Sequence, residues 1–277
     1  MRLICKIRFC LVLMFFLPLI AMGDEQSPYS PAFFLSPYQV EWDTSLGYTH
    51  SNYTVNSPVL KNSANSVSSS AYQGLSIGLP ENFTVGISDL YVHPIIDNPL
   101  NVYSPTGGFK NPVFSGSKIW GLGTPTLFKL NASVQPNTGV KAGLTTYNFG
   151  ATGIYQGNDG WVTSLNVYET INDGGDGGTA TAVAMVSKQF GKYIANASVG
   201  AARFPSVLMT NAYTAPSYGY SGTIELSRQI LDQAWIGASY SIGSTTNTYT
   251  QYVYYTAIPS NNRLLYNAYG LSLKVLF

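Results

Sequence analysis

The chain's only two histidines, His50 and His93, are the side chains best suited to acid–base chemistry. Nucleophilic hydrolysis needs a histidine beside a serine, with a carboxylate or amide to orient the ring. His93 is followed by Pro94, no serine–asparagine group can be placed beside either histidine, and no carboxylate lies near His50 in the sequence. The pattern predicts that the protein is not an enzyme and that both histidines are exposed near strand ends.

Asp173 and Asp176, in the Gly-rich stretch 172–178, are the candidates for binding a metal. Calcium loops supply more oxygen ligands than two carboxylates, so we expect no metal site there. Both cysteines, Cys5 and Cys10, lie within the first 23 residues. The rest of the chain therefore has no disulfide or thiol chemistry, and we expect no cofactor.

The first 23 residues have the pattern of a secretory signal peptide. Three basic residues precede an apolar run over residues 9–20, and small residues at 21–23 suit a cleavage site. The run is shorter than the ~20 residues that a membrane-spanning helix needs. We expect residues 1–23 to be a signal peptide that is removed on export.

The composition suits a sheet with one oily face and one polar face. Charged residues make up 10 % of the chain, against a usual ~25 %, while tyrosine numbers 21 and glycine 27. Beyond residue 23, 11 Lys and Arg remain (14 less three in the signal) against 13 Asp and Glu, a net charge of −2. This balance argues against a nucleic-acid partner. A membrane barrel would explain this composition, and a secreted β-solenoid or fibre would share it.

The last nine residues read as a strand with alternating faces. One parity carries a run of apolar side chains: Tyr269, Leu271, Leu273, Val275 and Phe277. The other parity carries Gly270, Ser272 and Lys274, with Leu276 as the one apolar exception. This ending resembles the C-terminal signature of bacterial outer-membrane β-barrels, in which a terminal Phe is an assembly signal. The resemblance implies a Gram-negative outer-membrane location, with barrel-assembly machinery and periplasmic chaperones, and then membrane lipid and lipopolysaccharide, as partners.

Alternation through the rest of the chain predicts an all-β fold: a closed antiparallel up-and-down transmembrane β-barrel of about 12 strands over residues 38–277. The expected strands are 39–49, 71–79, 83–92, 114–120, 124–134, 144–155, 161–170, 179–189, 193–204, 218–229, 233–242 and 264–277. Short connections at 80–82, 121–123, 156–160, 190–192 and 230–233 would face the periplasm, and longer ones, such as 50–70 and 243–263, would face outward. Residues 24–37 would be a periplasmic leader, whose run Ala32–Leu35 could instead plug the lumen or dock a partner.

Polar residues on the inward parity are the candidates for lining the lumen, because charge facing lipid costs several kcal/mol. These residues are Glu41, Asp43, Lys129, Asn131, Asn148, Asn196, Glu225 and Lys274. The first and last strands must pair to close a barrel, so we predict an ion pair between Lys274 and Glu41 or Asp43. At the expected periplasmic strand ends, an aromatic girdle would comprise Trp42, Trp120, Trp161, Trp235 and Phe277, although the parity of Trp235 points into the lumen.

Two turns resemble motifs of a family of outer-membrane transporters linked to aromatic-compound degradation. The stretch 121–125 (GLGTP) matches a G-x-G-D-P turn with Thr124 in place of Asp, and 135–139 (QPNTG) matches an L-P-T-G loop with Gln135 in place of Leu. The resemblance implies uptake of small solutes, including small apolar or aromatic compounds. We predict a porin-like channel or transporter; the alternative is a structural or surface-interaction barrel with Tyr-rich external loops and no conductance.

Overall fold

The computed structural model describes residues 27–58, 61–96, 107–137, 145–173, 178–209, 212–253 and 256–277. The expected signal peptide at 1–23 lies outside the described residues, as do residues 24–26 of the expected leader and Asp176. No helix within these described ranges is long and apolar enough to cross a membrane.

Nearly all of the described chain is β-structure. The strands are β1 (Val40–Asn56), β2 (Lys61–Leu79), β3 (Phe83–Ile96), β4 (Gly108–Phe109), β5 (Val113–Trp120), β6 (Thr126–Gln135), β7 (Thr146–Gln156), β8 (Trp161–Asn172), β9 (Thr179–Phe190), β10 (Tyr193–Phe204), β11 (Val207–Met209), β12 (Ala212–Thr214), β13 (Ser217–Leu231), β14 (Ala234–Val253) and β15 (Thr256–Leu276).

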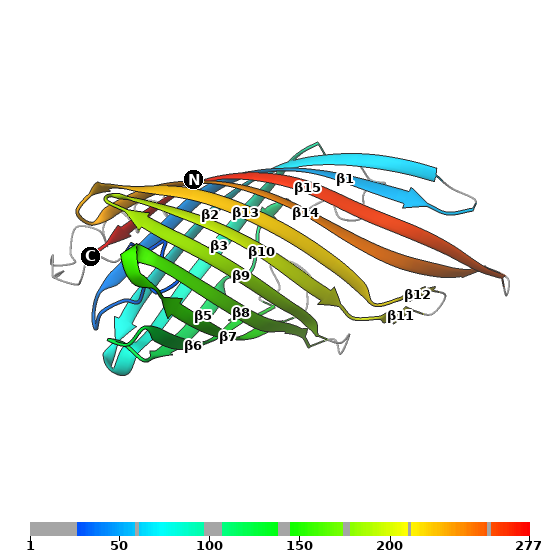
Figure 1. Cartoon of the computed structure of the whole chain (residues 1–277). Helices are drawn as coiled ribbons and strands as arrows, with labels where there is room; N and C mark the ends of the chain where they lie inside the picture. The colour runs from blue at the N-terminus through cyan, green and yellow to red at the C-terminus, as the bar shows by residue number, and fades with distance from the viewer. Residues whose placement is uncertain are drawn as a thin grey trace.

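Among the described residues, twelve long strands pair in sequence order and close into one antiparallel barrel, as predicted (Figure 1). The closing pair is β1 with β15, whose ladder runs from Glu41 opposite Leu276 to Asn56 opposite Asn261. The terminal residue completes this seam, because Phe277 and Val40 exchange both backbone hydrogen bonds at 2.8 and 2.9 Å. The three remaining strands are short: β4 pairs with β3, and β11 and β12 form a small hairpin beside β14.

The two faces of the barrel wall differ as the alternation requires. Outward side chains in the middle of the strands are large, apolar and exposed, including Val199 (67 %), Ile224 (61 %) and Leu271 (58 %). Their inward neighbours are mostly Ser, Thr, Asn and Gly, such as Ser198, Thr223 and Gly270. Such a wall can face hydrocarbon outside and water inside while every strand keeps a neighbour on each side.

The turns at the end of the barrel that carries the C-terminus are short (Figure 1). Two of them contain one turn of 3-10 helix, η1 (Pro80–Asn82) and η2 (Asn158–Gly160). Glu81 and Asp159 adopt a positive φ of 60° in these turns, where the chain reverses direction within three residues. The predicted short connections at 80–82 and 156–160 are confirmed.

Two long connections expected at the opposite end are instead strands. Residues 50–56 and 61–70 extend β1 and β2, and residues 243–253 and 256–263 extend β14 and β15, which reach far beyond β5–β8 in Figure 1. The prediction of loops at 50–70 and 243–263 is wrong. These extensions carry polar residues on both faces, so they lack the apolar alternation that marks a strand against lipid.

Between β3 and β5 the barrel wall is irregular. The expected strand at 114–120 is confirmed as β5, but β3 continues to Ile96, and β4 pairs beside Tyr91 and Val92. Pro94 lies beside a register shift between β2 and β3, and Pro112 directly precedes β5.

The apolar outer face gives a stability prediction. Replacing Ile224, in the middle of β13, with Arg places a charge where lipid is expected and should lower the free energy of unfolding by about 2–4 kcal/mol. The same change at Tyr218, near the outer end of β13, should cost about 0–1 kcal/mol. Urea unfolding of protein refolded into lipid vesicles measures both; equal losses at the two positions would contradict a lipid-facing wall.

Candidate functional site in the lumen

The described part of the expected leader, residues 27–37, lies inside the barrel at the end with the short turns. Its side chains contact two opposite sides of the barrel wall. Tyr29 packs with Ile194 of β10 and Trp235 of β14, whereas Ala32 packs with Ile119, Leu127 and Ile154 of β5–β7. Ala32 is 1 % exposed and Leu35 is 4 % exposed. This segment, which we call the crossing segment (residues 27–37), therefore spans the lumen from wall to wall.

Polar contacts hold the start of the crossing segment. The Tyr29 hydroxyl lies 2.8 Å from the Ser272 hydroxyl, and the Asn196 side-chain amide donates a 3.0 Å hydrogen bond to the Tyr29 carbonyl oxygen. The Lys274 ammonium donates to the Pro28 carbonyl oxygen at 3.4 Å. Burial raises the pKa of the Tyr29 phenol above its ordinary value, so this group stays neutral.

The end of the crossing segment rests directly on β2. Tyr38 N–H donates to the Gly78 carbonyl oxygen at 2.7 Å, and Gly78 N–H donates to the Gln39 carbonyl oxygen at 2.9 Å. A Cβ atom at Gly78 would collide with the backbone carbonyl oxygens of Ser36 and Leu35. Glycine at this position lets the two backbones approach each other.

The seam between β1 and β15 carries the predicted ion pairs. Lys274 stands opposite Asp43 in the ladder, with its Nζ 3.6 Å from Asp43 Oδ2 and 3.7 Å from Glu41 Oε1. The three side chains are only 14–22 % exposed. The ammonium of Lys274, on the last strand, therefore contacts two carboxylates of the first strand and one backbone carbonyl oxygen of the crossing segment.

The remaining predicted lumen residues all lie on the inward parity of their strands. Asn196 donates to Glu225 at 2.9 Å, and Asn148 donates to Ser133 at 3.0 Å and accepts from Thr170. Asn131 faces Gly150 on the adjacent strand, and Lys129 faces Thr152. Four of the five charged members, Glu41, Asp43, Glu225 and Lys274, gather near the crossing segment. The fifth, Lys129, lies with Asn131 and Asn148 on β6 and β7.

Only part of the expected aromatic girdle lies outside. Trp120 (40 % exposed) and Trp161 (49 % exposed) point outward at the end with the short turns, where Trp42 and Phe277 are half-buried. Trp235 is 3 % exposed and packs inside against Tyr29. Its assignment to the girdle is wrong because its inward position in β14 faces the crossing segment.

The apolar lumen residues that contact the crossing segment were not predicted from the sequence. Ile119, Leu127, Ile154 and Ile194 all occupy inward positions and are at most 3 % exposed. Each lies within a few residues of a short turn. Apolar side chains at one level of an otherwise polar inner face are the signal that a segment of chain covers them.

The turn at 121–125 also supports the crossing segment. Gly121 and Gly123 have φ of +83°, and the Thr124 hydroxyl lies 2.7 Å from the carbonyl oxygens of both Gly121 and Thr126. Leu122, at the centre of the turn, packs against the cluster around Ala32. Thr124, which replaces the Asp of the motif, therefore fixes the turn through its side chain.

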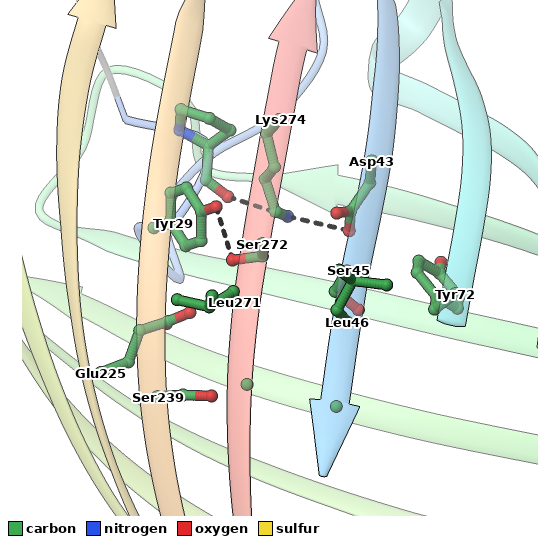
Figure 2. Close-up of a pocket in the computed structure, with 13 residues that line it drawn as sticks. Tyr29, Asp43, Ser45, Leu46, Tyr72, Glu225, Ser239, Leu271, Ser272 and Lys274 are labelled. Atoms are coloured by element: carbon green, nitrogen blue, oxygen red, sulfur yellow. Dashed lines mark hydrogen bonds and ion pairs between the residues drawn. The ribbon is translucent and has the colours of Figure 1, made fainter. Parts of the chain in front are cut away.

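Above the crossing segment lies a cavity of about 370 Å³. Its wall includes Tyr29, Asp43, Ser45, Tyr72, Glu225, Ser239, Ser272 and Lys274, from the crossing segment and strands β1, β2, β13, β14 and β15 (Figure 2). Gly47 and Gly270 face each other across the seam and leave this part of the wall flat. The cavity is the candidate binding site.

The two histidines lie apart from this site. His50 is in β1 opposite Val67 and Asn267, and His93 is an exposed residue of β3 opposite Ser69. Both belong to strands, on the outward parity.

Comparison with known proteins finds the same fold among outer-membrane channels. The COG4313 outer membrane channel from Pseudomonas putida F1 has a TM-score of 0.57 at 10 % identity, with 93 % of this chain and 100 % of that chain covered. The KdgM porin in complex with disordered oligogalacturonate has a TM-score of 0.50 at 8 % identity, covering 83 % and 98 %. No protein-family model and no curated protein matches the sequence. At these identities the similarity establishes the fold, that of an outer-membrane β-barrel.

Removing the seam cation should destabilise the barrel. Lys274→Met leaves Glu41 and Asp43 close together without a counter-charge and should lower the free energy of unfolding by about 1–3 kcal/mol, less than the ~3–5 kcal/mol of a dry buried pair because lumen water screens the charges. Urea unfolding in vesicles at neutral pH measures the loss. A triple variant, Lys274→Met with Glu41→Gln and Asp43→Asn, should recover most of it; no recovery would mean that packing of the lysine stem, and not its charge, matters.

Proposed function

We propose that the protein is an outer-membrane channel for small solutes, surrounded by lipid and lipopolysaccharide, in which the crossing segment narrows the periplasmic end of the lumen. The observation that carries the proposal is the wall itself: a closed ring of strands with exposed apolar side chains outside and hydroxyl and amide groups inside. The shared fold with known outer-membrane channels supports it.

The charges inside the lumen bear on which solutes would pass. Glu41 and Asp43 are paired with Lys274, and the two predicted lumen charges that have no ion pair among the described residues, Lys129 and Glu225, are of opposite sign. We expect weak ion selectivity for this reason. The resemblance to transporters of aromatic compounds favours apolar solutes, whereas the Ser, Thr and Asn side chains of the inner wall favour polar ones.

A second candidate function is surface interaction through the extended hairpins of β1–β2 and β14–β15. These extensions are joined by polar side-chain contacts, including Asn52 to Asn65 at 2.7 Å and Ser51 to Ser66 at 2.7 Å. Their polar faces suit contact with water or a hydrophilic partner at the cell surface. This role would not require conductance.

Planar-bilayer recordings distinguish these functions and test the crossing segment. Tyr29→Ala removes the contact with Ser272 and the packing against Trp235, so single-channel conductance should rise severalfold over the parent protein. Tyr38→Ala is the matched control, since Tyr38 is 71 % exposed, and its conductance should equal that of the parent.

Deleting residues 27–36 gives the stronger form of the same test. The shortened chain should conduct at least as well as Tyr29→Ala, because only Pro37 of the crossing segment would then remain. Steady absence of conductance in a correctly folded deletion variant would reject the channel and favour the surface-interaction barrel.

A further inference from the structure

We propose that the cavity above the crossing segment binds a neutral polyhydroxylated solute, a monosaccharide or cyclic polyol. The proposal rests on the channel function, which brings such a solute to the site, and it names the class of solute. Its volume of about 370 Å³ is at the lower end of the ~300–1,000 Å³ typical of ligand pockets. The cavity therefore suits one small solute.

The cavity wall is rich in groups that accept or exchange hydrogen bonds with hydroxyls. Glu225 receives one hydrogen bond, from Asn196 to Oε2, and no further hydrogen bond or ion pair of Glu225 is found among the described residues. Its second carboxylate oxygen is therefore available to a ligand donor. Ser45, Ser239 and Ser272 add hydroxyl groups around the same space (Figure 2).

The same wall disfavours an anion. Among the described residues that line the cavity, Lys274 is the one cation, and its ammonium already contacts Glu41, Asp43 and the Pro28 carbonyl oxygen. Asp43 and Glu225 of the same lining supply two negative charges against this one positive charge. A carboxylate-bearing solute would meet repulsion with no unpaired cation of this lining to offset it.

Tyrosine rings provide the apolar part of the site. Tyr29 and Tyr72 both line the cavity, and the hydroxyl end of Tyr72 lies beside Gly74, where a Cβ atom would come within 2.6 Å of the hydroxyl oxygen. The rings of these two tyrosines are the groups of the wall that can pack against the C–H face of a sugar ring.

The solute class follows from these features together. Two tyrosine rings and several hydroxyl groups, with no unpaired cation among the described residues that line the cavity, match a ring that carries hydroxyl groups on its edge and C–H groups on its faces. A purely aromatic solute would leave Glu225 and the serines without partners, which is costly in a confined site.

The proposal is tested by calorimetric titration of the full chain refolded in detergent micelles. The probes are D-glucose, protonated D-glucosamine, D-glucuronate and phenol, which differ in charge or polarity at similar size. Glucose should bind, with glucuronate at least tenfold weaker. Glu225→Gln should weaken glucose binding about tenfold, since a charged acceptor makes the stronger hydrogen bond.

Matched variants separate the site from the fold. Glu169→Gln removes a carboxylate from the exposed outer face of β8 and should leave glucose binding unchanged. Ser239→Leu fills the cavity and should abolish binding; the heat-modifiable mobility of the folded barrel on gels verifies that it folds.

The outcomes are distinct from those of the channel test. Glucose binding that is lost in Glu225→Gln and Ser239→Leu supports the site, even if the protein fails to conduct and the channel function is rejected. Normal conductance without glucose binding overturns the site alone. Tighter binding of glucosamine, equal binding of glucuronate, or binding of phenol only would each overturn the assignment to a neutral hydroxylated solute.

Discussion

The need to pair every backbone N–H and C=O group governs this structure. A sheet that faces hydrocarbon can leave no edge, because an unpaired backbone group there costs several kcal/mol. The ladder between β1 and β15 removes the edge, and it is completed by the last residue of the chain. Once the ring is closed, strand alternation decides the rest: apolar groups face outward and small polar groups face inward.

Closure also brings charged side chains together at the seam. Glu41 and Asp43 come from the first strand and Lys274 from the last, so the charge group exists only when the barrel is closed. Because the first strand follows directly from the crossing segment, the chain enters the lumen beside this seam. The cavity then forms between the seam, the crossing segment and the neighbouring strands.

Much of this arrangement was predictable from the sequence. Alternation over Tyr269–Phe277 and the twelve strand segments gave the closed barrel, and the charges on the first and last strands gave the seam ion pairs. The failures have physical causes. Residues 50–70 and 243–263 read as loops because both faces of these strands are polar. The sequence of residues 24–37 fits a periplasmic leader, a plug of the lumen or a docking segment, because its prolines and apolar residues have no regular spacing.

The apolar inward positions explain why the sequence alone does not show that the crossing segment lies in the lumen. Leu276 counted as an exception to its strand's pattern, and Trp235 was placed in a girdle despite its parity. Each is ambiguous alone, since a single inward apolar side chain can fill a gap between neighbours. In the structure Trp235 packs with Ile194 and Tyr29, and Ile119, Leu127 and Ile154 pack with Ala32. These two clusters become visible only when the strand register is known.

The barrel does not depend on the crossing segment for its integrity. Backbone pairing between β1 and β15 continues over the whole length of β1, far beyond the contacts of Pro28 and Tyr29. If the segment left the lumen, Lys274 would lose one carbonyl partner but keep both carboxylates, so the ion pairs of the seam would remain. The segment is held mainly by neutral hydrogen bonds and a few apolar contacts, which are individually weak in a wet lumen. A closed wall with a separately attached crossing segment is therefore compatible with opening of the lumen without opening of the sheet.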